Sequence, residues 1–216
     1  MSLSTTPAPA RTDAPRASVA TTTRPPATTR LVRRAGTAVA AGAGLWAAGL
    51  VAFGLNAEEG WPSALEGISS LMFQLGLVAL VTVQLRTGAT GTGRLARFFL
   101  HLEHVLLGLA ITSTLAYVVT PGSADEAWFL ALDVFWPLSM LGMAAIGVRI
   151  AIAGRWKGLA RFWPLGAESW APVVIPLAAA FSGAASFIAA GHLLIGYAML
   201  GVVLARRPEL TGARDS

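Results

Sequence analysis

Residues 63–85 read SALEGISSLMFQLGLVALVTVQL, and this run indicates the fold class. It carries one charged side chain, Glu66, in a length that exceeds the roughly 20 helical residues needed to cross a bilayer core of about 30 Å. Similar apolar runs occupy 35–55, 98–120 and 127–148, and a further long one lies between Arg161 and Arg206. The sequence therefore predicts a polytopic membrane protein.

Composition supports this prediction and excludes other classes. Of the 216 residues, 55% are hydrophobic and 12% charged, and the mean hydropathy is +0.63. Soluble domains carry about 25% charged residues. A disordered chain or a coiled coil is excluded by this hydropathy, and a disulfide-rich secreted domain by the absence of Cys. The net charge of +5 does not indicate a nucleic-acid partner, because the cations lie between the apolar runs.

The last apolar stretch is long enough for two helices. As a single helix it would be about 66 Å long, at roughly 1.5 Å per residue, which is twice a bilayer. The small residues of 182–186 favour a turn, with helices over 166–182 and 186–205. We therefore expect an all-α bundle of six transmembrane helices in three consecutive hairpins. Pro137 is expected to kink its span, because proline lacks the backbone N–H that a helix needs.

The charges give an independent test of this count. When the connecting segments are assigned alternately to two sides, all sixteen Lys and Arg residues fall on one side. The other side carries Glu58, Glu59, Asp125 and Glu126 and no cation. Because Lys and Arg are enriched in cytoplasmic loops, both termini are predicted to be cytoplasmic. The expected location is the inner (cytoplasmic) membrane, crossed several times.

Three regions follow from this organisation. Residues 1–30 form a Pro-, Thr- and Arg-rich tract, predicted to be a disordered cytoplasmic tail because it cannot bury enough apolar surface. Residues 31–207 form the six-helix transmembrane domain, with no cleaved signal peptide expected. Residues 208–216 form a short cytoplasmic tail. The cytoplasmic loops have at most about twenty residues, too few to build a catalytic core.

The first span has a stripe of small residues. Gly36, Ala40, Gly44 and Ala48 recur at every fourth position, so they share one helix face. Small residues let membrane helices approach closely. The stripe predicts helix packing, either within this bundle or against a second copy or a membrane partner protein.

Ionisable residues inside spans are costly in hydrocarbon and are candidates for function. Glu66, Asp133 and His192 come from different spans but have similar expected depths, near the outer surface. We hypothesise that they share a site with Gln74, which would bind protons or small cations. The alternative is structural: His192 bonds to Asp133, or to a carbonyl freed by Pro137, and joins two helices.

A metal site is a second possibility. His101 and His104 are three residues apart, so both lie on one helix face, and Glu168 is the one further donor expected at their depth. Glu103 points roughly the opposite way, with Thr114. This set is incomplete, so no cofactor is predicted, with a haem or a metal left open as the alternative.

The membrane part, 31–207, resembles small six-span inner-membrane proteins of high-GC Gram-positive bacteria in its composition and topology. No activity is assigned to that group, so the resemblance implies no site residues. The sequence favours a structural or partner-binding membrane subunit. The alternative is a small transporter or ligand-binding protein that uses the outer acidic and histidine cluster. An enzyme is not expected, because no catalytic triad and no complete metal set is recognisable. The expected partners are the lipid bilayer and a second copy or another membrane protein, and no nucleic acid.

Overall fold

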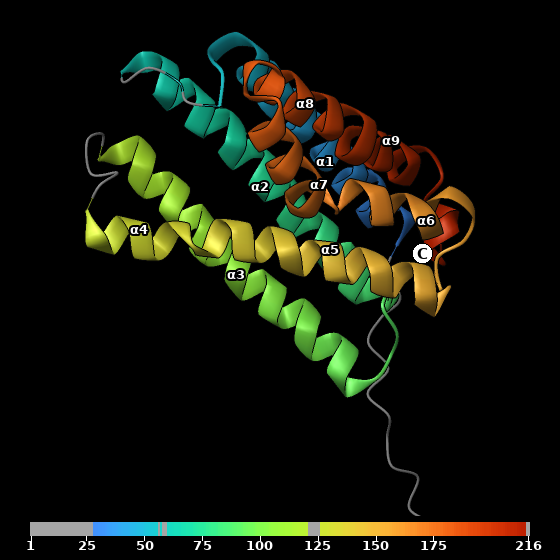
Figure 1. The fold of residues 1–216 in the computed structure, drawn as a ribbon. Helices are drawn as coiled ribbons and strands as arrows, with labels where there is room; N and C mark the ends of the chain where they lie inside the picture. The colour runs from blue at the N-terminus through green and yellow to red at the C-terminus, as the bar shows by residue number, and fades with distance from the viewer. Residues whose placement is uncertain (1–27, 56, 58–59, 121–125, 215–216) are drawn as a thin grey trace, which may run out of the picture.

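The computed structural model describes residues 28–55, 57, 60–120 and 126–214, and all regular elements in these residues are helical (Figure 1). Most of the predicted disordered tail, 1–30, lies outside the described residues. Thr28 is the N-cap of the first helix, where its side chain accepts a hydrogen bond from the Leu31 backbone N–H. Thr28 also pairs with Arg214 in an isolated bridge, which brings the two ends of the described chain together.

Three long helices open the chain: α1 (Thr29–Phe53), α2 (Trp61–Thr87) and α3 (Arg94–Val119). The next apolar run contains two helices, α4 (Ala127–Asp133) and α5 (Phe135–Ala153). The helix is interrupted at Val134, three residues before Pro137, whereas the predicted kink itself stays a prediction. Pro137 has no N–H to donate to the Asp133 carbonyl four residues earlier, and α4 ends at Asp133.

The remaining chain forms shorter elements. These are α6 (Gly158–Ala167), α7 (Trp170–Ala180), the 3₁₀ turn η1 (Ser182–Ala184), α8 (Ala185–His192), the π-helical η2 (Leu193–Ala198), α9 (Met199–Arg206) and the 3₁₀ turn η3 (Pro208–Thr211). The turn predicted at 182–186 coincides with η1. The segment after the apolar run 127–148 was expected to connect two spans, but most of it is helical, because α5 continues to Ala153 and α6 begins at Gly158. Pro164 lies inside α6.

Five helical segments are long and apolar enough to cross a membrane: α1, α2, α3, the 127–153 segment and the 182–206 segment. Helix α7 is apolar but has only 11 residues, so the span predicted over 166–182 is not a single long helix. The chain is thus an all-helical apolar bundle, compatible with an integral membrane protein.

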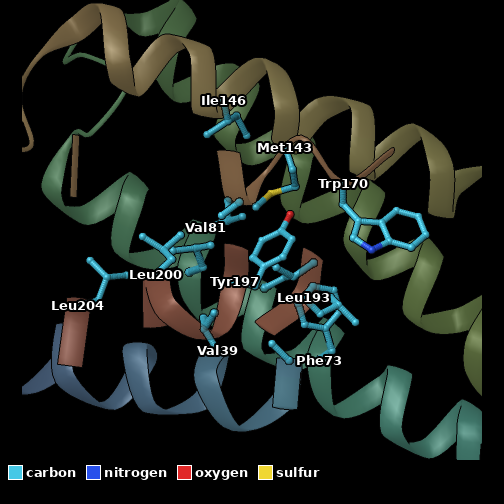
Figure 2. Close-up of a cluster of buried hydrophobic side chains, with 14 of the residues drawn as sticks. Val39, Phe73, Val81, Met143, Ile146, Trp170, Leu193, Tyr197, Leu200 and Leu204 are labelled. Carbon is cyan, nitrogen blue, oxygen red and sulfur yellow. The ribbon is translucent and has the colours of Figure 1, made fainter. Parts of the chain in front are cut away.

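The contacts between neighbouring helices close into a ring. Helix α1 contacts α2, α2 contacts α3, and α3 contacts α5. Helix α5 contacts both α6 and α7, which in turn contact α9 and α8, and these close the ring against α1. The side chains inside this ring form the core, including Phe73, Met143 and Tyr197 (Figure 2).

Glycines set the closest helix contacts of α1. A Cβ added at Gly42 would lie 2.6 Å from the Met72 carbonyl oxygen of α2, and one at Gly76 would lie 3.0 Å from the Ala38 carbonyl oxygen of α1. The two backbones therefore approach too closely for larger residues. The small-residue stripe divides in two. Gly36 and Ala40 meet Gly201 of α9, whereas no described atom lies within 4 Å of a Cβ added at Gly44, and Ala48 is exposed.

Replacing Gly42 with Leu should separate α1 from α2. We expect Gly42→Leu to lower the free energy of unfolding by about 1–3 kcal/mol or more, because overpacking forces the backbones apart. Gly108→Leu on α3 is the matched control, since no described atom lies within 4 Å of a Cβ at Gly108. Thermal unfolding of the purified protein in detergent measures both. Equal stability of the two variants would contradict the close approach.

Candidate functional site

The helical conformation is interrupted between α6 and α7, and Glu168 lies at this break. Helix α6 ends at Ala167, where the Glu168 N–H donates to the Pro164 carbonyl and the Ser169 hydroxyl donates to the Gly166 carbonyl. Pro172 cannot donate to the Glu168 carbonyl, so the two helices do not join into one. The break therefore holds an acidic side chain inside the ring of helices.

Glu168 has no exposed surface. Its Oε1 accepts a hydrogen bond from the Gln84 Nε2 of α2, while its Oε2 has no hydrogen-bond partner among the described residues. The carboxylate lies against α5 at Gly147, where an added Cβ would be 3.1 Å from Oε2 and 2.8 Å from the Pro164 carbonyl oxygen. Gly147 thus provides the space that Glu168 occupies.

A second carboxylate, that of Glu103 on α3, is 2% exposed. The Ser139 hydroxyl of α5 donates to its Oε1 at 2.9 Å. This carboxylate also lies against a glycine of α5, Gly142, at which any Cβ would clash with it. Gly142 and Gly147 are five residues apart, about 7.5 Å along the helix axis. Helix α5 therefore makes room for both acids inside the bundle.

Tyr197 of η2 completes this group of polar side chains. Its ring is packed edge-on against Phe73, with centroids 4.9 Å apart, and its hydroxyl points toward Met143 of α5 (Figure 2). The hydroxyl is fully buried and has no hydrogen-bond partner among the described residues. We call Glu103, Glu168, Gln84, Ser139 and Tyr197 the inner polar cluster.

The inner polar cluster has acceptors in excess of donors. The hydrogen bonds of both carboxylates come from neutral groups, an amide and a hydroxyl. Burying an ionised carboxylate is costly unless a cation or several donors compensate it. The arrangement can therefore take up a proton or a small hard cation, since carboxylate, amide and hydroxyl oxygens are the ligands such cations prefer.

The outer residues predicted from the sequence have separate partners. Glu66 Oε1 accepts from Trp46 Nε1 at 2.8 Å, and Asp133 Oδ1 accepts from the Ser113 hydroxyl at 3.4 Å, with Asp133 exposed. Gln74 donates to the Thr114 hydroxyl at 2.7 Å. No hydrogen bond in the described residues joins any two of the predicted set.

His192, the remaining member, lies at the end of α8 in a groove beside α6, and its Nδ1 is buried without a hydrogen-bond partner among the described residues. That groove is lined by neither Glu66 nor Asp133. A shared outer site of these residues stays a prediction, without support from their contacts.

The three residues considered for a metal site, His101, His104 and Glu168, also have separate surroundings. His104 Nδ1 lies 2.7 Å from the Leu100 carbonyl and its Nε2 lies 3.1 Å from the Thr82 hydroxyl, while His101 is exposed. Glu168 contacts Gln84 instead. Across the part of the chain that the structure describes, no group of three or more His, Cys, Asp or Glu residues is placed to hold a metal ion.

Sequence reasoning missed four members of this site: Gln84, Glu103, Ser139 and Tyr197. A signal was present for Glu103, which shares a helix face with Thr114, and a polar face of a span is expected to point inward. No local signal identified Tyr197, since one tyrosine in an apolar run is usual.

No protein-family model, no curated protein and no solved structure matches the chain. The assignment of the site therefore rests on the geometry of the inner polar cluster.

The hydrogen bond between Gln84 and Glu168 can be measured by a double-mutant cycle. Gln84→Met and Glu168→Met should each lower the free energy of unfolding by about 1–3 kcal/mol, because each leaves a buried polar group unpaired. The double variant should lose less than the sum of the two, since it removes both polar groups. Additive losses in equilibrium unfolding would show that the two side chains are not coupled.

Proposed function

We propose that the protein is an integral membrane protein with six crossings that binds a proton or a small cation at Glu103 and Glu168. The observation that carries this proposal is the burial of both carboxylates, 2% and 0% exposed, with only neutral hydrogen-bond donors. Ionisable side chains inside membrane bundles occur mainly on proton and ion pathways. Ion binding is also the function of the transporter or ligand-binding alternative that the sequence offered. The proposed residues differ, since that alternative used the outer acidic and histidine cluster and not Glu103 and Glu168.

The sixth crossing would be made by α6 and α7 together. They cover residues 158–180, about 34 Å at roughly 1.5 Å per residue. Helix α6 contacts α9 and η2, and α7 contacts α8, so the broken pair runs antiparallel to the 182–206 segment along its length. Non-helical backbone at membrane depth is tolerated where protein buries it or where it lines a cavity, which fits the buried Glu168 at the break.

The orientation in this proposal follows from the charges. With six crossings, all sixteen cations would fall on the side of the termini, so both termini would be cytoplasmic and the membrane would be the inner one.

Reporter fusions test the sixth crossing directly. A reporter inserted after Gly183 should report the exterior, and one at the C-terminus should report the cytoplasm, because α6 and α7 cross between Lys157 and Gly183. A fusion after Gly88 is the cytoplasmic reference. If α6 and α7 do not cross, the Gly183 fusion reports the cytoplasm and the C-terminal fusion the exterior.

Ion binding is tested in proteoliposomes that enclose a pH-sensitive dye and are energised with a potassium gradient and valinomycin. We expect proton uptake several-fold above that of empty liposomes, and its loss in Glu168→Gln and Glu103→Gln, which keep the side-chain size but cannot bind the proton. Parallel assays with Na⁺ and K⁺ distinguish a cation from a proton.

Asp133→Asn is the matched control, because it neutralises an acid outside the inner polar cluster. Loss of uptake in Asp133→Asn, with normal uptake in both glutamine variants, would favour the outer site and overturn the inner one. Uptake equal to that of empty liposomes, with no change in carboxyl infrared bands between wild type and Glu168→Gln, would exclude proton binding at the pair.

A second candidate function is a partner-binding membrane subunit. The observation that favours it is the uncovered half of the α1 stripe, where Gly44 has open space and Ala48 is exposed beside Leu45 and Val51. The natural occupant of such a face is a helix of a second copy or of another membrane protein.

Gly44→Leu should reduce association through this face while leaving the fold intact, because no described atom lies within 4 Å of a Cβ added there. The measurement is the oligomeric state in detergent by native mass spectrometry, together with energy transfer between labelled copies in liposomes. Gly108→Leu is the control. A monomer in wild type and in both variants would remove self-association as the function of this face.

A further inference from the structure

A groove runs along the outer surface of the bundle between α6 and the α8–η2 segment. It encloses about 760 Å³, within the range of about 300–1,000 Å³ that is usual for sites of small ligands. It extends along α6 from Gly158 to Ala167, about 14 Å at 1.5 Å per residue. We call it the α6 groove. It does not include any residue of the inner polar cluster.

The width of the α6 groove is set by glycines and by one tryptophan. At its inner wall the helices touch, since a Cβ added at Gly196 would lie 3.0 Å from the Ala167 Cα. The Trp163 Nε1 donates to the carbonyls of Ile195 and Gly196, both at 3.1 Å, which fixes α6 against the π-helical turn. At Gly166 and Gly191 the groove is open, because no described atom lies within 4 Å of an added Cβ.

Apart from His192 and the Trp163 Nε1, the lining of the α6 groove is apolar. Leu159, Phe162 and Ile195 are 52%, 58% and 69% exposed, like many apolar side chains on the outside of this bundle. The α6 groove suits a flexible hydrocarbon chain, since it is long and open along one side.

Two positive charges lie next to residues that line the α6 groove, although neither side chain lines it itself. Lys157 precedes the lining residue Gly158, and the Arg161 guanidinium lies over the ring of the lining residue Phe162, 4.8 Å from its centroid. Both side chains donate to backbone carbonyls, Lys157 to Gly154 at 3.1 Å and Arg161 to Ala151 at 3.0 Å. These bonds do not neutralise the two positive charges. Basic pockets beside membrane helices bind the headgroups of anionic lipids.

From these observations we infer that the α6 groove binds one anionic phospholipid. An acyl chain lies in the groove between α6 and η2, and the phosphate lies at Lys157 and Arg161. The site is on the side of the membrane that carries the cations, where α6 begins next to the C-terminal η3 (Figure 1). It uses different residues from the inner polar cluster, so it stands whether or not that cluster binds an ion.

The test is native mass spectrometry of the full chain released from nanodiscs that contain equal amounts of palmitoyl-oleoyl phosphatidylglycerol and phosphatidylcholine. The wild type should retain one phosphatidylglycerol. Gly166→Leu and Gly191→Leu add a side chain at positions where no described atom lies within 4 Å of the new Cβ, so it should occupy the groove, and retention should fall by about tenfold through loss of the apolar contact. Unfolding temperatures equal to that of the wild type verify the fold of each variant.

Two controls separate this site from general lipid contact. Gly108→Leu, on α3 outside the groove, should retain the lipid as the wild type does. Lys157→Gln and Arg161→Gln should reduce the preference for phosphatidylglycerol over phosphatidylcholine several-fold, because the headgroups differ in net charge.

Three results would overturn the inference. They are wild-type retention in both groove variants, equal loss in Gly108→Leu, and no preference for phosphatidylglycerol in the wild type.

Discussion

The hydrogen bond from Gln84 to Glu168 joins α2 to the break between α6 and α7 across the interior of the bundle. A carboxylate with no exposed surface needs donors, because water does not reach it and the surrounding hydrocarbon offers none. The burial of the Glu168 carboxylate therefore constrains three parts of the bundle. These are the break between α6 and α7, Gly147 of α5, which makes room for the carboxylate, and α2, which carries its donor Gln84. Few side-chain hydrogen bonds in the described core join elements so distant in sequence.

Helix α5 is the element around which the two acids are arranged. Its Ser139 donates a hydrogen bond to Glu103. Its glycines lack side chains where the two carboxylates lie, Gly142 beside Glu103 and Gly147 beside Glu168. Larger residues at the two glycines would separate α5 from α3 and from α6. The same positions that allow close helix packing therefore also admit the polar side chains, so stability and the candidate ion site depend on the same helix contacts.

The break between α6 and α7 lies between the inner polar cluster and the α6 groove. Inside the ring, the break holds Glu168, and Tyr197 of the π-helical turn lies near it. Outside the ring, the same α6 and the same turn form the walls of the α6 groove, with Trp163 bridging them. π-helical turns in α-helices are frequent at functional sites, because the extra residue widens the turn and frees carbonyls. Here the Trp163 Nε1 donates a hydrogen bond to two carbonyls of the π-helical turn, those of Ile195 and Gly196.

The sequence by itself determined the all-helical class, the positions of α1, α2 and α3, the helix interruption before Pro137 and the turn near Ser182, because apolar run length and proline chemistry act locally. It did not predict α6, since a proline and four cations in 149–165 resemble a loop, whereas in the fold this segment packs against α5 and α9. The tertiary structure alone decided which polar residues meet. Glu103 and Glu168 are far apart in the chain, and the direction of each side chain depends on small rotations of its helix that no local pattern fixes. Glu66 and Asp133 matched in expected depth but face different neighbours, because depth along a helix does not determine which helix lies opposite.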